Sequence, residues 1–462
     1  MRLFFIVGCL IFSGVGFAQQ VASETPATRV LSAWLAAFNS ADTVQVKAFD
    51  DTDKPVTPMA QLARFRKQTG GFTLVRVEKG DATSITGLLK ENGSDNIARF
   101  ELTVSADEPP KMTGASIKLI PTPPDLAPPR LSQPEALAAL TRRLDIAASE
   151  DKFSGAVLIA KSGKVLYEKA WGRSGRETSV PVSLDTQFRL GSMNKMFTAI
   201  ATLQLIDGGK LSLDDTIGKH LTDYPNKDIA DRVTIRHLLT HTGGTGDIFG
   251  PEYDQNRLLL KSHADYVNLY GNRSPVHEPG ATWRYSNYGF VLLGALIEKL
   301  SGMSYYEYVQ QKVFAPALMN ATASLPETEF VAKRAVGYME EEGKWIPNTD
   351  TLPWRGSAAG GGYSTIGDLL RFADALQSGT LVSKALLAQA TRAQAQAYGY
   401  GFGTAGEDKW GGYGHTGGAP GMSGELRVIP KQGYVIIALS NLDPPAATRV
   451  VRFVEARLPE GP

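Results

Sequence analysis

The chain carries, between residues 191 and 205, the sequence GSMNKMFTAIATLQL. Nearly every residue after Lys195 favours a helix and most are apolar, and a helix that is apolar on most of its faces is buried. Residues three apart share one face of a helix, so Ser192 and Lys195 are expected side by side at its start. Burial lowers the pKa of a lysine, and the positive end of the helix dipole favours negative charge developing on the serine. The stretch therefore predicts a serine nucleophile with its own base.

Strands flank this helix on both sides in the sequence. We expect a helix over 135–148, a hairpin over 154–172, a mostly helical region over 210–385, strands over 426–429 and 434–439, and a last helix over 446–458. Strands at both ends with helices between them predict one α/β sandwich over residues 134–462, whose sheet is completed by distant segments.

A proline-rich stretch over 121–133 divides the chain, because dense prolines make a stiff, extended spacer. Before it, an amphipathic pattern over 27–41 predicts a helix, and alternating patterns at 72–77, 84–89, 97–102 and 115–120 predict strands. Residues 24–120 are thus expected to form a small α+β domain of the cystatin-like or NTF2-like kind. No cluster of His, Asp or Glu in it calls for catalysis, which favours an accessory role.

Size and charge limit the kinds of partner. The 462 residues suggest two domains, and 43% hydrophobic with 21% charged residues is ordinary for a globular protein. A net charge of +1 without a basic cluster argues against nucleic acid. The expected partner is a small molecule or a peptide-like substrate, with peptidoglycan as one candidate.

The first 18 residues resemble an export signal, with Arg2, an apolar stretch over 3–15, and a Gly16-Phe17-Ala18 cleavage site. The apolar stretch is too short to span a bilayer as a stable helix, although an uncleaved anchor and lipidation at Cys9 are the alternatives. Cys9 is the one cysteine, so cleavage after Ala18 leaves no disulfide. This combination predicts a bacterial periplasmic or secreted protein.

Two further motifs can serve a serine nucleophile. Tyr285-Ser286-Asn287 precedes an apolar helix, where the phenol can relay a proton and the amide can hold a substrate or the lysine. Three other Tyr-x-Asn copies, at Tyr224, Tyr266 and Tyr270, look like turn or helix-surface residues. A second Ser-x-x-Lys, from Ser149, lies in a charged stretch and is predicted to be surface.

His-Thr-Gly occurs twice. His241-Thr242-Gly243 is expected to end a helix with the glycine as its cap, in preference to a metal site built with His237. His415-Thr416-Gly417-Gly418 lies among strands, and glycines on an edge strand would let a substrate backbone approach closely.

These motifs, in this order, resemble the serine β-lactamase and penicillin-binding protein family, in the branch with class C β-lactamases, D-Ala-D-Ala carboxypeptidases and esterases. The resemblance spans about 134–462 and implies an antiparallel sheet with flanking helices plus a helical subdomain. It implies Ser192 as the acylated nucleophile, Lys195 as its base and Tyr285 as the proton shuttle. Asn287 would orient the substrate amide, His415, Thr416 and Gly417 would line the substrate site, and the Ser192 and Gly418 N–H groups would form an oxyanion hole. His415 departs from the lysine of most β-lactamases, which weakens the case for β-lactam hydrolysis.

The sequence thus predicts an exported serine hydrolase, without metal or organic cofactor, that acts through an acyl-enzyme on an amide, lactam or ester. The alternative is a penicillin or peptidoglycan sensor that is acylated once and stays acylated. The sequence contains no Gly-x-Ser-x-Gly elbow, the motif typical of α/β-hydrolases, which argues against that class.

Overall fold

The structure is a computed structural model that describes residues 24–40, 65–341, 343–404 and 412–459. The predicted export signal and Cys9 lie outside these residues. The chain divides into two compact units, Met1–Pro128 and Pro129–Pro462.

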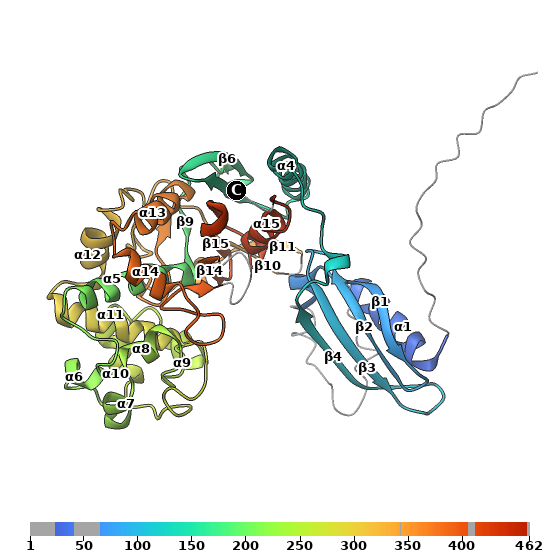
Figure 1. Ribbon diagram of the computed structural model, residues 1–462, viewed down its shortest axis with the longest axis horizontal. Coiled ribbons are helices and arrows are strands. Elements are labelled where there is room, and N and C mark those ends of the chain that lie inside the picture. Colours follow the sequence, from blue (N-terminus) through green and yellow to red (C-terminus); the bar gives the residue numbers. More distant parts are fainter. Residues whose placement is uncertain (1–23, 41–64, 342, 405–411, 460–462) are drawn as a thin grey trace, which may run out of the picture. The chain divides into compact units, whose positions relative to one another are not determined.

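In the first unit, the helix α1 (Pro26–Ser40) packs on a four-stranded antiparallel sheet, and residues 65–69 are also helical (Figure 1). The strands are in the order β1 (Phe72–Gly80), β2 (Ser84–Glu91), β3 (Ile97–Val104) and β4 (Met112–Ile120). Phe38 of the helix stacks on Phe72 of the first strand at 5.6 Å between ring centroids. The cystatin-like or NTF2-like assignment of this unit stays a prediction.

The proline-rich segment carries one short 3₁₀ turn, η1 (Pro124–Leu126). The helix α4 (Gln133–Ser149) follows it and begins with a capping box, in which Ser132 and Glu135 satisfy each other's backbone N–H groups.

A six-stranded antiparallel sheet organises the second unit, in the order β13-β14-β15-β16-β5-β6. Its strands are β5 (Gly155–Lys161), β6 (Lys164–Trp171), β13 (Gly403–Thr404), β14 (Tyr413–Ala419), β15 (Met422–Ile429) and β16 (Tyr434–Ser440). Residues 434–440 of β16 pair with residues 161–155 of β5, so the two ends of this unit meet in the sheet. The predicted α/β sandwich completed by distant segments is confirmed.

Helices cover both faces of this sheet, as Figure 1 shows. On one face, α4 and α15 (Ala446–Glu455) share an apolar cluster with the sheet. On the other face, a larger cluster includes α5 (Asn194–Asp207), α11 (Asn287–Ser301) and α13 (Ile366–Ser378).

Further α-helices of this unit are α6 (Ile217–His220), α7 (Lys227–Arg232), α8 (Ile235–Leu239), α9 (Pro251–Asn256), α10 (His263–Tyr270), α12 (Tyr305–Val309) and α14 (Lys384–Ala390). Short connections include the two-stranded pairs β7 (Arg173–Gly175) with β8 (Val180–Pro181), β9 (Phe188–Arg189) with β12 (Tyr363–Ser364), and β10 (Tyr338–Glu341) with β11 (Lys344–Pro347).

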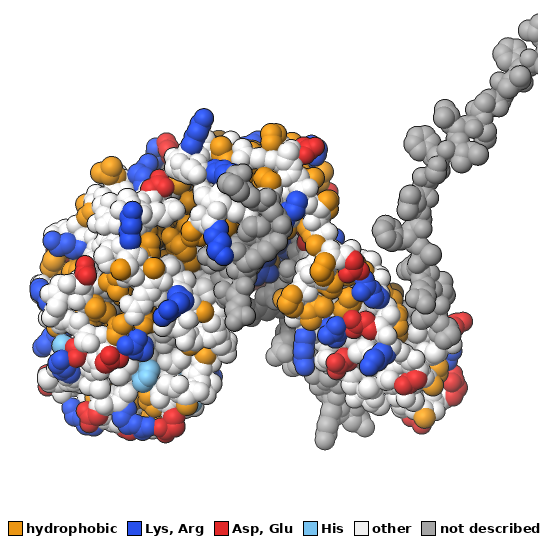
Figure 2. All heavy atoms as spheres, viewed as in Figure 1, with side chains coloured by type: hydrophobic (Ala, Val, Ile, Leu, Met, Phe, Trp, Pro, Cys, Tyr) orange, Lys and Arg blue, Asp and Glu red, His pale blue; other side chains and the backbone are white. Residues whose placement is uncertain are grey.

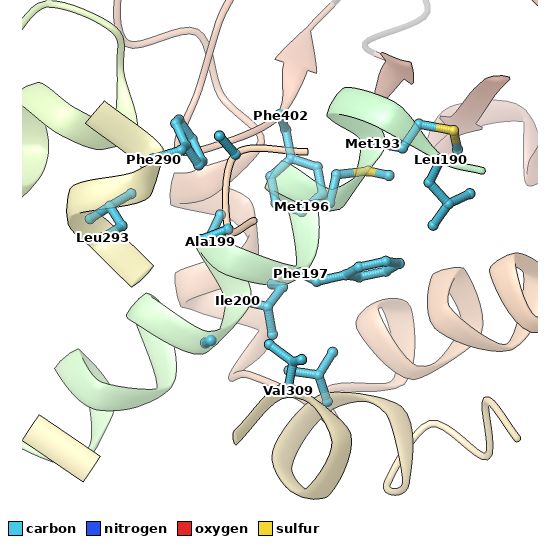
Figure 3. Packing of buried hydrophobic residues seen from close by; sticks show 14 of the residues in the cluster. Leu190, Met193, Met196, Phe197, Ala199, Ile200, Phe290, Leu293, Val309 and Phe402 are labelled. Carbon is cyan, nitrogen blue, oxygen red and sulfur yellow. The ribbon is translucent and has the colours of Figure 1, made fainter. Parts of the chain in front are cut away.

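The helix α5 is enclosed by side chains on all sides, as predicted from its composition (Figure 3). Phe197 meets Phe314 and Phe372 edge-on, with ring centroids 5.0 and 4.8 Å away. Its buried polar groups are paired: Asn194 Nδ2 donates to Tyr305 OH at 3.0 Å, and Thr198 Oγ1 donates to the Ala358 carbonyl at 2.6 Å. A helix held on every face gives the residues at its N-terminus a fixed position.

Charged side chains of both signs are interspersed on the visible face of the molecule in Figure 2. None of the helices in the described ranges has the length and apolar character that crossing a bilayer requires.

Candidate active site

Ser192 lies on a 3₁₀ turn, η2 (Gly191–Met193), that leads directly into α5. Gly191 has a φ of +53°, and a Cβ there would come within 3.1 Å of the Gly418 backbone nitrogen, so glycine lets the strand β14 pass close to the turn. One helical turn after Ser192, Lys195 donates from Nζ to Ser192 Oγ at 3.3 Å. The predicted serine–lysine juxtaposition is therefore present.

The Lys195 side chain is completely buried, and burial lowers its pKa to about 7, while the Asp247 carboxylate acts in the opposite direction. Its Nζ also donates to Asn287 Oδ1 at 2.7 Å and to the Ala359 carbonyl at 2.5 Å. An amine with a pKa of about 7 is roughly half neutral near pH 7, and the neutral form can accept the Ser192 proton.

Tyr285 and Asn287 flank the first turn of α11. Ser286 caps this helix by accepting from the Gly289 N–H at 2.9 Å, which places Tyr285 on the preceding loop and Asn287 at the first helical position. Burial raises the pKa of the Tyr285 phenol, and the neighbouring Ser192 side chain acts in the opposite direction. Lys195 Nζ lies 4.7 Å from the centroid of the Tyr285 ring. The structure thus brings Ser192, Lys195 and Tyr285 together.

Both ends of the Asn287 amide contact protein groups. Its Oδ1 accepts from Lys195, and its Nδ2 donates to Asp247 Oδ1 at 2.9 Å. Asp247 Oδ1 also accepts from the Ile248 N–H at 2.7 Å, which orients the carboxylate. This arrangement suits Asn287 to holding the lysine, one of its two expected roles, more than to holding a substrate amide.

The sequence motifs did not predict that Asp247 and the Ala359 carbonyl belong to the site. Asp247 follows the motif His241-Thr242-Gly243-Gly244 by three residues, and no spacing rule links it to Asn287. Ala359 precedes the glycines of 360–362, and the helix α13 begins shortly after them, where Thr365 Oγ1 accepts from the Asp368 N–H at 3.1 Å.

His241 does not lie at a helix end capped by Gly243, as the sequence predicted. The helix α8 ends at Leu239, and the residue in the left-handed conformation is His241 itself, with φ of +58°, so Gly243 is not its cap. The His241 ring packs against Tyr285 with centroids 4.2 Å apart, and its Nδ1 accepts from the Ser286 N–H at 3.1 Å. Among the described residues, no three His, Cys, Asp or Glu side chains are grouped so that they could hold a metal ion.

The segment 415–418 lies on β14, beside the turn that carries Ser192. β14 is not the outermost strand, since the two-residue β13 pairs with it, which corrects the edge-strand expectation. His415 is buried; its Nδ1 lies 2.6 Å from the Thr416 carbonyl and its Nε2 lies 2.8 Å from Tyr398 OH. Burial, with the charge of Lys195, lowers the His415 pKa to about 4.

The competing motif copies lie elsewhere. Ser149 is the last residue of α4, and the side chain of Lys152 is 73% exposed and pairs with Glu150, as predicted for a surface copy. The other Tyr-x-Asn tyrosines, in contrast, are core residues, because Tyr224, Tyr266 and Tyr270 are all buried. The prediction of helix-surface positions was wrong for Tyr266 and Tyr270, which are buried on α10, whereas Tyr224 does end a turn, since its N–H donates to the Leu221 carbonyl at 3.0 Å.

The fold and the site together define a class, that of the serine β-lactamases and penicillin-binding proteins. The sequence profile of the Beta-lactamase family matches residues 140–458, more than half of the chain, and the chain belongs to this family.

Individual relatives cover different shares of the chain. Penicillin-binding protein 4* of Bacillus subtilis (strain 168) is 32% identical over 51% of this chain, which spans 54% of that protein's length. Esterase EstB of Burkholderia gladioli is 34% identical over 39% of this chain and 50% of its own. The crystal structure of a penicillin-binding protein from Bacillus halodurans superimposes with a TM-score of 0.63 and 29% identity, covering 68% of this chain and 99% of that one.

Proposed function

We propose that this chain is an exported serine hydrolase that works through an acyl-enzyme on an amide, a lactam or an ester. The observation that carries the proposal is the buried Lys195 amine, 3.3 Å from Ser192 Oγ and with its pKa lowered to about 7. A serine hydroxyl is a weak nucleophile unless an adjacent base takes its proton.

In acylation, Ser192 Oγ attacks the substrate carbonyl carbon and its proton passes to Lys195. The C–N or C–O bond then breaks, and the leaving group takes up a proton through Tyr285, whose buried phenol lies beside Ser192. In deacylation, water attacks the ester carbon, which releases the acid and restores the Ser192 hydroxyl. These steps use only protein groups and water, so the proposal invokes no metal or organic cofactor.

The N–H groups of Ser192 and Gly418 are the proposed oxyanion hole. The close approach of Gly191 to the Gly418 nitrogen supports this assignment. One such donor contributes about 3 kcal/mol to the transition state in enzymes of this type. Asn287 and Asp247 are proposed to hold Lys195 in place, and residues 415–417 to form the wall beside the substrate.

Export is proposed from the first 18 residues, and the unit before the proline-rich segment is proposed as an accessory domain. Similarity to penicillin-binding proteins supports a site of action outside the cytoplasm.

Labelling with a fluorescent fluorophosphonate and a fluorescent penicillin tests the nucleophile. The wild type should be labelled by the fluorophosphonate, and Ser192→Ala should not. Ser149→Ala is the matched control, because Ser149 begins the other Ser-x-x-Lys and bonds only to the Ile146 carbonyl at the end of α4. It should be labelled like the wild type.

Equal labelling of wild type and Ser192→Ala would contradict the mechanism. Turnover of a chromogenic ester separates the two functions expected from the sequence. Continued release of product supports a hydrolase, whereas release of one equivalent of product and no more supports a sensor.

A further inference from the structure

A tight turn over residues 357–360 carries a carbonyl oxygen that accepts from Lys195. The Ser357 N–H donates to the Gly360 carbonyl at 2.8 Å, and the Gly360 N–H donates to the Ser357 carbonyl at 3.1 Å, so the turn is closed on itself. Its Ala359 carbonyl accepts from Lys195 Nζ at 2.5 Å. A group that holds this turn in place therefore bears on the position of the proposed base.

Side chains hold this turn from two directions. From α5, the helix that also carries the proposed base, Asn194 Nδ2 donates to the Ser357 carbonyl at 2.9 Å. From the same helix, Thr198 Oγ1 donates to the Ala358 carbonyl at 2.6 Å. From α10, His263 Nε2 accepts from the Ala358 N–H at 3.0 Å. The bond to His263 ties the turn to a different helix and so fixes its place relative to the helical region.

His263 is in turn oriented by an acid on α11. The Ala358 N–H can only donate, so Nε2 of His263 carries no proton and the ring proton is on Nδ1. Nδ1 lies 3.0 Å from Glu298 Oε1 and donates to it. The same oxygen accepts from the Tyr305 N–H at 3.1 Å, so two donors hold the carboxylate. Glu298 thus favours the tautomer in which His263 can accept from the turn.

The helix α11 leaves space for the His263 ring against the turn. The ring is 1% exposed, and Gly294 in the middle of α11 faces it. A Cβ at residue 294 would lie 2.6 Å from His263 Nε2 and 2.6 Å from Ala358 Cβ, closer than non-bonded atoms approach. Glycine inside a helix costs about 1 kcal/mol relative to alanine, and here it leaves the room that this hydrogen bond needs.

We propose that His263, oriented by Glu298, positions the base of the reaction by holding the turn that accepts from Lys195 Nζ. The helix α11 then supports the amine in two ways, because Asn287 accepts from it directly and Glu298 acts through His263. A base displaced from Ser192 Oγ takes its proton less readily, so loss of this support should slow acylation. The inference rests on the proposed serine hydrolase function and adds a positioning residue to it.

The rate of fluorophosphonate labelling of the full-length protein tests the proposal, because phosphonylation uses the same serine and base as acylation. The Oγ–P bond of Ser192 forms, fluoride leaves, and the serine proton passes to Lys195. Two exchanges separate the roles of the ring nitrogens. A Gln oxygen can reach the place of Nε2 and accept from Ala358, whereas an Asn side chain reaches only the place of Nδ1. We expect His263→Asn to slow labelling by about tenfold or more, and His263→Gln to stay within about threefold of the wild type.

His220→Asn is the matched control, because His220 Nε2 also pairs with an acid, Asp215 at 2.8 Å, and lies on α6, outside the contacts described above. Its labelling rate should equal that of the wild type. Glu298→Ala is a second test in case residue 263 tolerates no exchange, since the Glu298 side chain is 28% exposed. It removes the acceptor for His263 Nδ1 and should also slow labelling, whereas Glu298→Gln, whose oxygen can still accept, should slow it less. The Tm of each variant shows whether it is folded.

Folded His263→Asn and Glu298→Ala variants that are labelled at the wild-type rate would overturn the inference while leaving the hydrolase function intact. Labelling of His263→Gln that is as slow as that of His263→Asn would also overturn it, because the ring would then act through its packing and not through its hydrogen bond. If the wild type is not labelled at Ser192, the hydrolase function itself fails, and the inference fails with it.

Discussion

At the scale of single residues, the proposed chemistry depends on opposing effects on the amine of Lys195. Complete burial lowers the pKa of Lys195, and the carboxylate of Asp247 opposes that shift through its charge. Asn287 lies between them, accepting from Lys195 and donating to Asp247. The balance between these effects sets the pH above which Lys195 can act as a base.

Asp247→Asn changes this balance with little change of shape. The wild-type kcat/KM should rise through about pH 7, where Lys195 loses its proton. Removal of the negative charge at residue 247 disfavours the ammonium form, so the pKa of Lys195 falls and the acidic limb of the profile moves to lower pH. The asparagine oxygen can still accept from Asn287 Nδ2. The measurement is kcat/KM for a neutral ester between pH 5 and 9.

Asp254→Asn is the control for loss of one charge, because Asp254 is exposed on α9. Its profile should match that of the wild type. An acidic limb that stays in place in Asp247→Asn, or moves to higher pH, would show that Asp247 does not act on the base.

At the scale of elements, one buried acid lies between the sheet and its covering helix. Glu425 of β15 forms a hydrogen bond with Thr448 of α15, and its Oε2 has no partner among the described protein atoms. Burial raises the Glu425 pKa to about 7 from its ordinary value of 4.5, although Arg452 and Arg427 act to lower it. The contact between β15 and α15 is therefore weaker when Glu425 is ionised.

Glu425→Gln should stabilise the protein at high pH. Between pH 4.5 and about 7 the unfolded chain loses the Glu425 proton while the folded chain keeps it, so wild-type stability falls as pH rises through this window. The glutamine side chain does not titrate, so the variant does not lose stability in this pH window. It should match the wild type near pH 4 and exceed it by up to roughly 3 kcal/mol at pH 8, at about 1.4 kcal/mol per unit of pKa shift.

Urea unfolding at both pH values measures the difference. Glu168→Gln, the same exchange at an exposed position of β6, should change stability by less than about 0.5 kcal/mol at either pH. A Glu425→Gln variant that is less stable than the wild type at pH 8 would contradict the argument.

At the scale of the whole molecule, every residue proposed for the chemistry belongs to the second unit. The first unit has its own apolar core, formed by α1 and its sheet. The start of the second unit is tied to its end, since the Leu131 N–H donates to the Arg457 carbonyl at 2.8 Å. The two units therefore have separate cores.

A chain that begins at Pro129 should fold and keep the proposed hydrolase activity. Because no residue of the site is removed, kcat/KM for a small neutral ester should stay within about twofold of the full-length value, as for changes far from a site. The measurements are kcat/KM and the Tm of the truncated protein. A folded truncation that has lost most of its activity would show that the first unit takes part in the reaction.

Local patterns along the chain were sufficient to predict the main elements and the juxtaposition of Ser192 with Lys195. Ser192 and Lys195 are one helical turn apart, so their juxtaposition follows from helix geometry alone once α5 is predicted. The position of Tyr285 just before a helix also follows from local sequence, because its neighbour Ser286 caps that helix. Family resemblance then linked Tyr285 to Ser192, which spacing alone does not do.

The sequence by itself thus determined the buried helix, the strands and the placement of Lys195 beside Ser192, because these depend on residues a few positions apart. Only the tertiary structure decided what surrounds that base. The partners of Lys195 are Asn287, 92 residues away, and the Ala359 carbonyl, 164 residues away. The Tyr398 hydroxyl forms a hydrogen bond with His415 Nε2, and His241, which follows another helix, packs on Tyr285. Such contacts arise where separate elements meet in the packed core, and no periodicity of the chain encodes them.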